Sequence, residues 1–419
     1  MEKKKKPAIR FKGFTDSWEQ RKLGDVASSF EYGLNAAAKA YDGEYKYIRI
    51  TDIDDNTHEF LTDNLTSPDI DLIGADNYKL TEGDILFART GASVGKSYIY
   101  RNSDGLVYYA GFLIRARINE EYDEEFVFQN TLTDRYNKYI AVTSQRSGQP
   151  GVNAQEYAEF EINVPKKEEQ TKIGTYFRNL DYLITLHQRK YDKLQIIKKS
   201  MLEKMFPQNG SCFPEIRFKG FTDSWEQRKL GNFGKASGGT SIESEFSEDG
   251  IYKVINIGSY SENSIYNDQG IRAIKSDKTS NRVLNRNDLT MILNDKTTSG
   301  NIIGRVLLIE ESGIYVYNQR TERIEIDLDE YDPVFLYEML NAPNIREKII
   351  KQAQGNTQIY VNWTAISLLE YMIPSKEEQA KIGEYLHSIS NLITLHQRMQ
   401  KNSKQYIITM KSILNNIKY

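Results

Sequence analysis

The stretch that decides the fold spans residues 9–24, IRFKGFTDSWEQRKLG, because residues 216–231 repeat the same letters at an offset of 207. The regions that follow the two copies, residues 25–165 and 232–374, share almost no sequence. Self-similarity over half of a chain indicates a duplicated architecture. The sequence therefore predicts one frame, used twice, that carries two different inserts.

The frame also repeats where each insert ends. Residues 167–174, KEEQTKIG, recur as residues 376–383, KEEQAKIG, and residues 183–189, LITLHQR, recur unchanged as residues 392–398. Neither ending contains a proline, and apolar residues follow heptad spacing along both, which predicts two long helices packed on one another. Two separate core helices are the alternative, but each would then expose a long apolar stripe.

The expected helix-pairing residues lie on two lines along these helices. They are Leu180, Leu183, His187 and Leu194 in the first copy and Ile389, Leu392, His396 and Met399 in the second. His187 and His396 hold equivalent positions near the middle of their helices, so an antiparallel pair would bring them together. We interpret both as polar residues that fix the register of pairing. A metal pair is disfavoured, because no further ligands cluster around them.

Composition bounds the class of protein. With 419 residues, 39% of them hydrophobic and 27% charged, the chain is long enough for more than one core. It has no apolar run of transmembrane length, and the basic start MEKKKK lacks the apolar stretch of a signal peptide, so we expect a soluble, cytoplasmic protein that contacts no membrane. One cysteine, Cys212, and four histidines disfavour a disulfide framework or a metal site.

Both inserts are predicted to be strand-rich. Residues 96–101 and 106–109, on either side of the turn sequence NSDG, predict a β-hairpin. Residues 305–309 and 314–317 repeat that anatomy around EESG. Further strands are expected at residues 47–53 and 252–257. We expect the two inserts to share a mixed fold while they differ in surface chemistry.

Charge is distributed unevenly between inserts and frame. Residues 25–165 carry a net charge of −12 and residues 232–374 a net charge of −6, against −3 for the whole chain. The shared frame therefore carries about +15. Such a frame could follow DNA phosphates or face acidic surfaces on partner proteins, and the sequence leaves both open.

The doubled frame resembles a known family. The pattern Trp-Glu-x-x-x-Leu-Gly spans Trp18–Gly24 and Trp225–Gly231, and the phrases VPKKEEQTKI and IPSKEEQAKI span residues 164–173 and 373–382. Together they resemble the specificity subunit (HsdS) of type I restriction-modification systems, over essentially the whole chain.

The inserts add to this resemblance. YIRITDI at residues 47–53 and GDILFARTG at residues 83–91 are similar to the family's target-recognition domain. In the second insert the matching phrases are YKVINI at residues 252–257 and RNDLTMIL at residues 286–293, followed by Gly300 and Gly304.

The resemblance implies an α+β fold: two strand-rich, mixed α/β target-recognition domains, separated by two long antiparallel coiled-coil helices and related by a pseudo-two-fold internal repeat. The expected divisions are an opening segment at residues 1–24, recognition domains at 25–165 and 232–374, spacer helices at 166–206 and 375–419, and a junction at 207–231.

The implied function follows from the same family. Each variable domain would read one half of a bipartite, gapped and asymmetric site on double-stranded DNA. The helices would set the spacing and dock two modification (methyltransferase) subunits, through which restriction subunits would join. The chain itself would catalyse nothing and hold no cofactor; S-adenosylmethionine, ATP and Mg would belong to its partners.

One loop is the first candidate for DNA contact. Residues 89–97, RTGASVGKS, look like a phosphate-binding loop, but Gly91 and Gly95 enclose three residues instead of four, which disfavours nucleotide binding. We favour a loop that contacts DNA, with an ordinary surface turn as the alternative. It would offer Arg89, Thr90, Ser93 and Lys96.

The other candidates come from aligned positions of the inserts. Asn and Gln can pair with adenine, and Arg and Lys with guanine or phosphate. The stretch that matches the first loop offers Lys296, Thr298, Asn301 and Arg305. Asn318, Gln319 and Arg320 stand where the first insert has Ala, Gly and Phe, so we place them outside the core. Amide-rich glycine turns before the return to the frame offer Arg146, Gln149, Gln354, Asn356 and Gln358. Solvated strand edges and polar turn caps are the alternatives.

Trp18 and Trp225, and the phenylalanines beside them, are predicted to be packing anchors and not base-stacking groups. Two competing functions stay open. A nuclease or methyltransferase is disfavoured, because neither an Asn/Asp-Pro-Pro-aromatic motif nor a glycine-rich cofactor motif is present. A coiled-coil scaffold or connector that binds no DNA would explain the repeat, but offers no reason for unlike inserts.

Overall fold

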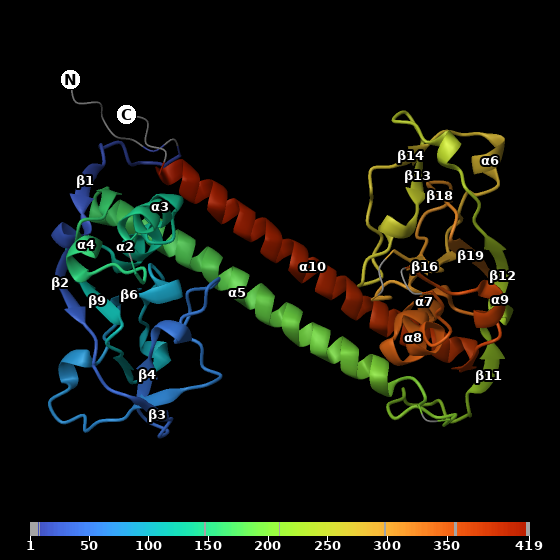
Figure 1. Cartoon of the computed structure of the whole chain (residues 1–419), viewed down its shortest axis with the longest axis horizontal. Helices are drawn as coiled ribbons and strands as arrows, with labels where there is room; N and C mark the ends of the chain where they lie inside the picture. Colours follow the sequence, from blue (N-terminus) through green and yellow to red (C-terminus); the bar gives the residue numbers. More distant parts are fainter. Residues whose placement is uncertain are drawn as a thin grey trace. The chain divides into compact units, whose positions relative to one another are not determined.

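The computed structural model describes residues 7, 9–145, 148–208, 210–296, 299–355 and 358–415. The chain forms two compact units: unit 1, Met1–Arg189 with Gln397–Tyr419, and unit 2, Lys190–His396. Two long helices, α5 (Lys167–Lys204) and α10 (Lys376–Asn415), each run through both units (Figure 1). The expected α+β class and the two long helices are confirmed. The units divide both helices, so the expected domain boundaries stay a prediction.

The centre of unit 1 is a four-stranded antiparallel sheet in the order β2-β9-β6-β7. These strands are β2 (Ala27–Tyr32), β9 (Leu113–Ile118), β6 (Ile85–Ala88) and β7 (Ser97–Ile99). Alternate side chains of β6 point to opposite faces, as a pleated strand requires. Ile85 and Phe87 pack with the helices, whereas Leu86 and Ala88 pack with a second layer.

The remaining elements of unit 1 cover the two faces of this sheet. The helices are α1 (Leu23–Val26), α2 (Glu124–Asn130), α3 (Asp134–Thr143) and α4 (Ala154–Ala158). The second layer contains β4 (Lys46–Ile48), parallel to β8 (Val107–Tyr109), and β3 (Ala38–Ala40) pairs with β5 (Thr66–Pro68).

Unit 2 repeats this plan. Its sheet has the order β12-β19-β15-β17, with β12 (Gly234–Gly238), β19 (Thr321–Ile326), β15 (Leu289–Ile292) and β17 (Val306–Leu308). A second sheet contains β14 (Arg272–Ala273), β13 (Tyr252–Ile255) and β18 (Tyr315–Tyr317), and β16 (Asn294–Asp295) pairs with β20 (Ile359–Tyr360). The helices are α6 (Asp277–Ser280), α7 (Pro333–Asn341), α8 (Pro343–Ile350) and α9 (Trp363–Ile366). The expectation that the two inserts share a fold is confirmed.

The expected hairpins are wrong in both inserts. β7 pairs antiparallel with β6, whereas β8 pairs parallel with β4, so the two strands belong to different sheets. Between them the Asp104 carboxylate accepts hydrogen bonds from the backbone N–H of Arg101 (3.1 Å) and the hydroxyl of Tyr98 (2.6 Å). These bonds hold a 3₁₀ turn that redirects the chain to the second layer. In unit 2, β17 and β18 likewise pair with β15 and β13.

The repeated opening and the end of each insert form one two-stranded ribbon. β1 (Glu19–Lys22) pairs antiparallel with β10 (Glu161–Val164), and β11 (Glu226–Lys229) pairs with β21 (Glu370–Ile373) in the same register. Each ribbon lies directly before a long helix in the chain. The frame therefore ties both ends of an insert to the start of its helix.

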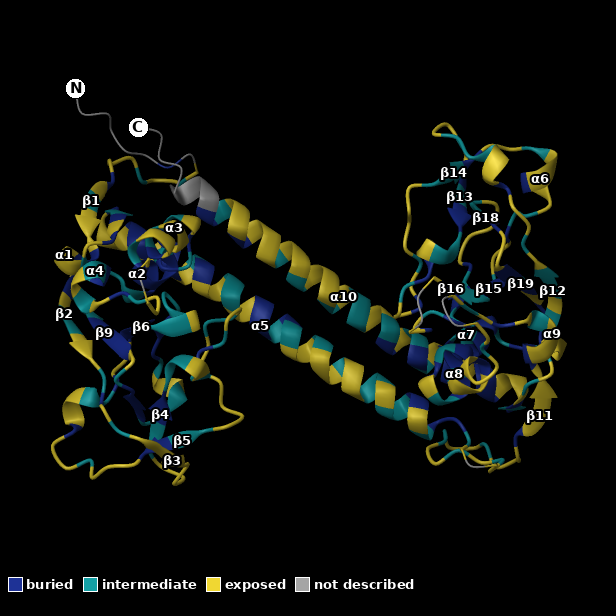
Figure 2. Ribbon diagram, in the orientation of Figure 1, coloured by how far each residue is buried: buried dark blue, intermediate teal, exposed yellow. Residues whose placement is uncertain are grey.

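Within each unit, α5 and α10 run antiparallel. In unit 1 the hydroxyls of Tyr176 and Tyr406 lie 2.9 Å apart, and Gln400, earlier along α10, donates to Gln188, later along α5. From the first contact to the second, the residue numbers increase on α5 and decrease on α10, so the two helices are antiparallel. Figure 2 shows half-buried and buried residues interleaved with exposed ones along both helices.

The expected seam between these helices is partly wrong. His187 and Ile389 are buried, and Leu180 packs against the core of unit 1. Leu183, Leu392 and Met399, in contrast, are 42, 44 and 40% exposed. The neighbouring Ile184 is buried in the seam with Ile407 instead of Leu183. Adjacent helical residues are about 100° apart around the axis, so the burial of Ile184 turns Leu183 outward.

Candidate DNA interface

Two segments distant in sequence meet at the end of β6 in unit 1. The backbone N–H of Gly91 donates to the carbonyl of Pro150 (3.0 Å), and that of Val152 donates to the carbonyl of Arg89 (2.9 Å). A β-bridge joins Thr90 to Gly151 between these bonds. The structure therefore brings the predicted Arg89 loop beside the predicted Gln149 turn.

Glycine at position 91 allows this approach. Its backbone has a φ of 71°, in the left-handed region that favours glycine. A Cβ added there would lie 3.1 Å from Nε2 of Gln149. The Gln149 side chain thus lies over the loop, and the surface here presents the half-buried Arg89 and Thr90 together with the exposed Gln149.

Arg89 is also flanked by two aromatic rings that the sequence reading missed. Its guanidinium carbon lies 5.0 Å from the ring centre of Tyr32 and 5.9 Å from that of Phe112. Tyr32 is 43% and Phe112 57% exposed. A guanidinium held between exposed rings is a suitable surface for stacking on bases or binding phosphate. The available signal was Phe112 itself, an aromatic residue aligned with Arg320.

Two other members of this loop have structural partners. Nζ of Lys96 lies 2.5 Å from Oδ1 of Asp55, and its side chain is only 17% exposed. The backbone carbonyl of Ser93 accepts from the N–H of Lys96 (3.0 Å). The positive charge of Lys96 is therefore largely balanced within the domain, and its predicted role in DNA contact stays a prediction.

Unit 2 makes the equivalent connections with different side chains. The N–H of Val361 donates to the carbonyl of Leu293 (2.8 Å), and the N–H of Leu293 donates to the carbonyl of Arg320 (2.9 Å). Nη1 of Arg320 donates to Oε1 of Gln358 (3.4 Å). Gln354 bridges to Tyr360, and Lys296 is exposed in the adjoining loop. The structure thus groups predicted residues from three separate segments.

Arg305 and Asn301 lie beside this group. Nη1 of Arg305 donates to Oγ of Ser264 (3.2 Å), and Nδ2 of Asn301 donates to Oε1 of Glu262 (2.8 Å). Burial and the nearby charge of Arg346 lower the pKa of Arg305 to about 10. Arg346, which the sequence reading missed, donates to the backbone carbonyls of Asn301 and Ile303. Two arginines therefore concentrate positive charge under the loop.

The expectation that Asn318 lies outside the core is wrong. Asn318 is 5% exposed, and its Oδ1 accepts a hydrogen bond from the buried N–H of Ile242 (3.1 Å). A polar residue can replace an apolar one in a core when its amide satisfies a buried backbone group. Its neighbour Gln319 is exposed and donates to Glu243 (3.4 Å). Arg146, Thr298 and Asn356 lie outside the described residues.

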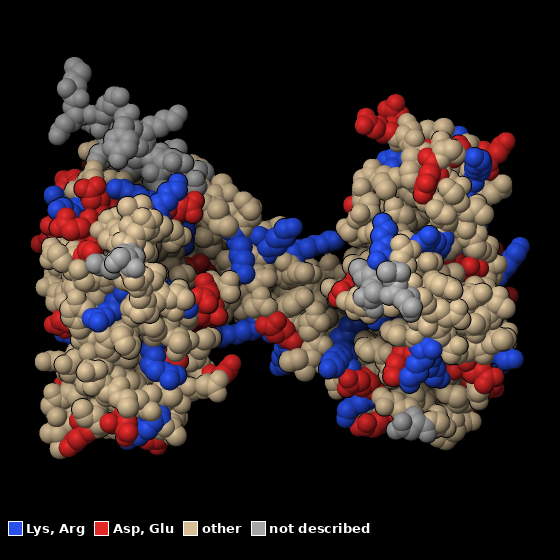
Figure 3. All heavy atoms as spheres, viewed as in Figure 1, with Lys and Arg blue, Asp and Glu red and all other residues tan. Residues whose placement is uncertain are grey.

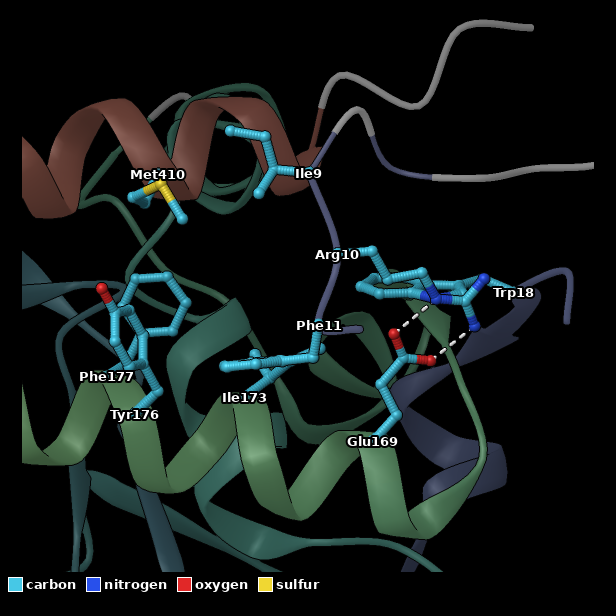
Figure 4. A pocket seen from close by; sticks show the side chains of 9 residues that line it. All are labelled: Ile9, Arg10, Phe11, Trp18, Glu169, Ile173, Tyr176, Phe177 and Met410. Atoms are coloured by element: carbon cyan, nitrogen blue, oxygen red, sulfur yellow. Dashed lines mark hydrogen bonds and ion pairs between the residues drawn. The ribbon is translucent and has the colours of Figure 1, made fainter. Parts of the chain in front are cut away.

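A clamp made from the repeated opening attaches that opening to the start of each long helix. Nε and Nη2 of Arg10 donate to the two carboxylate oxygens of Glu169 (2.6 Å each), and Arg217 donates to Glu378 in the same bidentate way (2.7 and 2.8 Å). Both carboxylates are buried. Figure 4 shows Arg10 and Glu169 beside a cavity of about 160 Å³ at the start of α5. Apolar residues line the rest: Ile9, Phe11, Trp18, Ile173, Tyr176, Phe177 and Met410.

The tryptophans of the opening are packing anchors, as predicted. Trp18 is 5% exposed and meets the ring of Phe126 edge-on at 6.1 Å between centres. Trp225 is 2% exposed and meets Phe335 in the same way, also at 6.1 Å. Because α2 and α7 carry these phenylalanines, the opening fixes the insert as well as the helix.

The exposed faces of the long helices are predominantly basic. Figure 3 shows Lys and Arg side chains over the helices and a mixture of both signs over each insert. Exposed cations on α5 and α10 include Arg178, Arg189, Lys190, Lys193, Lys199, Arg398, Lys401 and Lys404. His187 is buried and His396 half-buried, but they belong to different units, so their expected approach stays a prediction.

Among the described residues, no helix has the length and apolar character needed to cross a bilayer. Over the same residues, no three or more His, Cys, Asp or Glu side chains are grouped so that they could hold a metal ion.

Comparisons with known proteins agree with the repeat. The family model described as "Type I restriction modification DNA specificity domain" matches residues 15–195 and again residues 222–404. The chain is 23% identical over 410 residues to the type I restriction enzyme MjaVIII specificity subunit of Methanocaldococcus jannaschii, covering 96% of this chain and 92% of that protein. It is 24% identical over 412 residues, with the same coverage, to the putative type I restriction enzyme MjaX specificity subunit of that organism.

A solved structure shares the fold. The S subunit of a type I restriction-modification system from M. genitalium superimposes with a TM-score of 0.67 at 12% identity, over 97% of this chain and 98% of that one. Specificity subunits are the non-catalytic components of type I restriction enzymes. The two family matches cover most of both halves, and the chain therefore belongs to the family of type I restriction-modification specificity subunits.

Proposed function

We propose that this chain gives a type I restriction-modification complex its DNA sequence specificity, with each insert reading one half of a bipartite, gapped and asymmetric site. The observation that carries the proposal is the equivalence of two surfaces. In both units, the same backbone connections join the loop after the central strand to the turn before the frame. The side chains they present differ, with Arg89 and Phe112 in unit 1 and Lys296 and Arg320 in unit 2.

This difference is what two unlike half-sites require. Phosphate contacts supply affinity without regard to sequence, whereas contacts to base edges select the sequence. A common backbone can position both surfaces against DNA in the same way, and unlike side chains can then select unlike bases. The predicted Arg89, Thr90, Gln149, Lys296, Gln319, Arg320, Gln354 and Gln358 are the groups we assign to this contact, with Asn301 and Arg305 beside them.

We further propose that the helices set the separation of the half-sites and dock two modification subunits. Support comes from apolar residues on the outer faces of the helices. In unit 1, Tyr182 is 66% and Ile408 58% exposed; in unit 2, Ile196 is 70% and Leu395 49% exposed. Exposed apolar residues on an otherwise basic helix mark surfaces for protein partners. Half-sites about one turn of DNA apart, some 34 Å, would suit paired recognition domains.

On this proposal the chain binds no cofactor. Methyl transfer with S-adenosylmethionine would belong to the modification subunits, and ATP- and Mg-dependent cleavage to restriction subunits that join through them. DNA and these subunits are the expected partners.

A methylation profile tests the proposal. The full chain is combined with its modification subunits, S-adenosylmethionine and a DNA library, and the methylated sites are sequenced. We expect a single gapped, asymmetric sequence. If the chain were a connector that never touches DNA, methylation would show no sequence preference, or omitting the chain would leave the methylated sites unchanged.

Replacing one insert identifies what each domain reads. Residues 25–165 are exchanged for the equivalent insert of another family member, while the frame is kept. We expect one half of the methylated sequence to change and the other half to stay the same. A change in both halves would contradict the assignment of one half-site to each insert.

A further inference from the structure

The internal repeat allows two helix junctions to be compared position by position. In unit 1 the C-terminal part of α10 packs on α2 and the start of α5; in unit 2 the C-terminal part of α5 packs on α7 and the start of α10. An offset of 209 relates the two junctions, as in the repeated LITLHQR. The N-cap residues Asp123 of α2 and Asp332 of α7 obey the same offset, and each accepts from a phenylalanine N–H at 2.8 Å.

The junction of unit 2 contains an ion pair whose carboxylate is buried and whose lysine is half-buried. Nζ of Lys198 lies 2.8 Å from Oε2 of Glu338 and donates to Oγ of Ser390 at 2.6 Å. Oγ of Ser390 donates in turn to Oε1 of Glu338 (2.8 Å). The Glu338 side chain is 2% exposed. One turn further along α5, Leu202 is buried in the apolar core.

In the junction of unit 1, the lysine lies one turn later on the incoming helix. Lys411 of α10 is buried, its Nζ lies 5.6 Å from the ring centre of Phe177, and the acid whose charge acts on it is Asp181. Burial lowers the pKa of Lys411, and the charge of Asp181 opposes that change. Oδ2 of Asp181 accepts from Nε2 of Gln129 (2.8 Å). One turn earlier along α10, Ile407 is buried in the core.

When the two junctions are aligned by the repeat, positions that are charged in one junction are uncharged in the other. Lys198 corresponds to Ile407, and Leu202 corresponds to Lys411. On the receiving side, Glu338 corresponds to Gln129, and Ser390 corresponds to Asp181. Each unit therefore has its acid where its own incoming helix brings the lysine, although the frames around the two junctions are nearly identical.

We propose that these two lysines determine which helix docks on which unit, so that α5 pairs with α10 and not with the same helix of a second copy of the chain. If α5 from a second copy docked on unit 1, Lys198 would enter the apolar place of Ile407. Leu202 would then face Asp181, which would lose its cation. Asp181 is half-buried, and a carboxylate removed from water destabilises the fold when it lacks its cation, whereas a matched pair is tolerated.

This inference goes beyond the reading of DNA. A second copy of the chain offers the same heptads and the same frame, so apolar packing alone does not distinguish it. Pairing of unlike helices would keep one copy of each reader in a complex, a consequence that rests on the proposed function. The selection itself depends only on the contacts of the two junctions.

A double-mutant cycle in the full chain tests the proposal. Lys198→Ile with Leu202→Lys gives α5 the residues of α10, and Glu338→Gln with Ser390→Asp gives unit 2 the residues of unit 1. Each pair of changes alone should lower the unfolding midpoint of unit 2 by roughly 5–10 °C, measured by calorimetry. All four changes together should restore most of that loss, because lysine and acid again match.

The matched control uses the other junction. Ile407→Lys with Lys411→Leu should destabilise unit 1, and Gln129→Glu with Asp181→Ser should rescue it. If the effects of the helix changes and the receiving changes simply add in both units, the lysines do not select the partner and the proposal is overturned. If a helix variant alone fails to fold, recovery of folding in the corresponding four-fold variant measures the rescue, and a four-fold variant that also fails to fold, when its receiving changes alone do fold, overturns the proposal.

Discussion

At the scale of single residues, Arg89 combines three features suited to nucleic acid: a fixed charge, two exposed flanking rings and a neighbouring amide. We expect Arg89→Ala to weaken DNA binding by the assembled complex by about 1–3 kcal/mol, with a smaller dependence of affinity on salt. Binding to labelled DNA at several salt concentrations measures both effects. Lys138→Ala, which removes an exposed cation of α3 in the same domain, is the control. Equal losses from both variants would mean that general charge, and not this site, is responsible.

Glu322 of β19 is a second residue whose setting has a measurable consequence. Burial raises its pKa to about 7, and the charge of Arg282 opposes the change only partly. The folded state therefore holds the proton more tightly than the unfolded chain, in which the pKa is about 4.5. Stability contributed by this group is present at low pH and lost as pH rises through 7.

Glu322→Gln keeps the shape of the side chain and removes this cost. We expect the variant to raise the unfolding midpoint of unit 2 at about pH 8 and to leave it unchanged at about pH 4, where the acid is protonated in both states. Calorimetry at the two pH values makes the comparison. A stabilisation that is independent of pH would show that the proton is not involved.

At the scale of elements, the glycine of the repeated KEEQ-x-KI-Gly motif allows each long helix to approach the first turn of a helix in the insert. Gly383 of α10 lies against the first turn of α7, where an added Cβ would be 2.7 Å from the backbone N of Phe335 and 3.0 Å from Oδ1 of Asp332. Gly174 of α5 meets α2 in the same way. The contact is closest to backbone, so a side chain here cannot be accommodated by a rotamer change.

We expect Gly383→Ala to destabilise unit 2 by about 1–3 kcal/mol, although alanine favours helix formation over glycine by about 1 kcal/mol. Chemical denaturation of the full chain measures the change. The adjacent exposed residue supplies the control, since Glu384→Ala should have little effect. A stabilised Gly383→Ala protein would show that propensity outweighs the close approach.

The clamp of the repeated opening is the second element with a clear prediction. Glu378→Gln would leave Arg217 without its carboxylate partner beside the start of α10, and breaking a buried pair in this way should cost about 2–4 kcal/mol. The equivalent Glu169→Gln should destabilise unit 1 by a similar amount. Calorimetric unfolding of both variants checks whether each change destabilises only its own unit. A loss shared equally by both units would contradict two separate clamps.

At the scale of the whole molecule, the two units should respond differently to acid. His58 of unit 1 is half-buried, its Nδ1 lies 2.9 Å from the carbonyl oxygen of Ser97, and its partial removal from water lowers its pKa below the usual 6.5. Lys411 adds to this change, whereas Asp181 and Asp54 oppose it. The unfolded chain therefore binds the proton more readily, and unit 1 loses stability as pH falls from 6.5 toward the lower folded value.

Unit 2 has no counterpart of His58 among its described residues, and Glu322 acts in the opposite direction. Asp84 and Asp288 hold equivalent places in the two units, and burial raises the pKa of both, so their effects should be common to the two. Calorimetry between about pH 5 and pH 7 should show the midpoint of unit 1 falling in acid relative to that of unit 2. His58→Asn, which suits the left-handed backbone at φ 56°, should remove the part of this difference that comes from the fall of unit 1 in acid. Persistence of the difference would assign it to other groups.

The candidate site was only partly predictable from the sequence. Arg89, Gln149, Lys296, Arg320 and Gln358 were identified because polar residues beside glycines in unlike inserts are visible as letters. Tyr32 and Arg346 were missed, because each reaches its surface from a strand or helix far away in the chain. Asn318 was misplaced for a related reason: whether an amide is buried depends on which backbone group it meets.

By itself, the sequence determined the repeat, the two long antiparallel helices, the basic frame and the mixed fold of the inserts. These features depend on local periodicity and on comparison of one half of the chain with the other, and both can be read along the chain. Only the tertiary structure decided which face of each helix forms the seam, as with Ile184 in place of Leu183. Only the tertiary structure shows that β7 and β8 belong to different sheets and that Lys198 and Lys411 interact with different acids. Such outcomes depend on which distant groups exclude water together, and that is settled by packing in three dimensions.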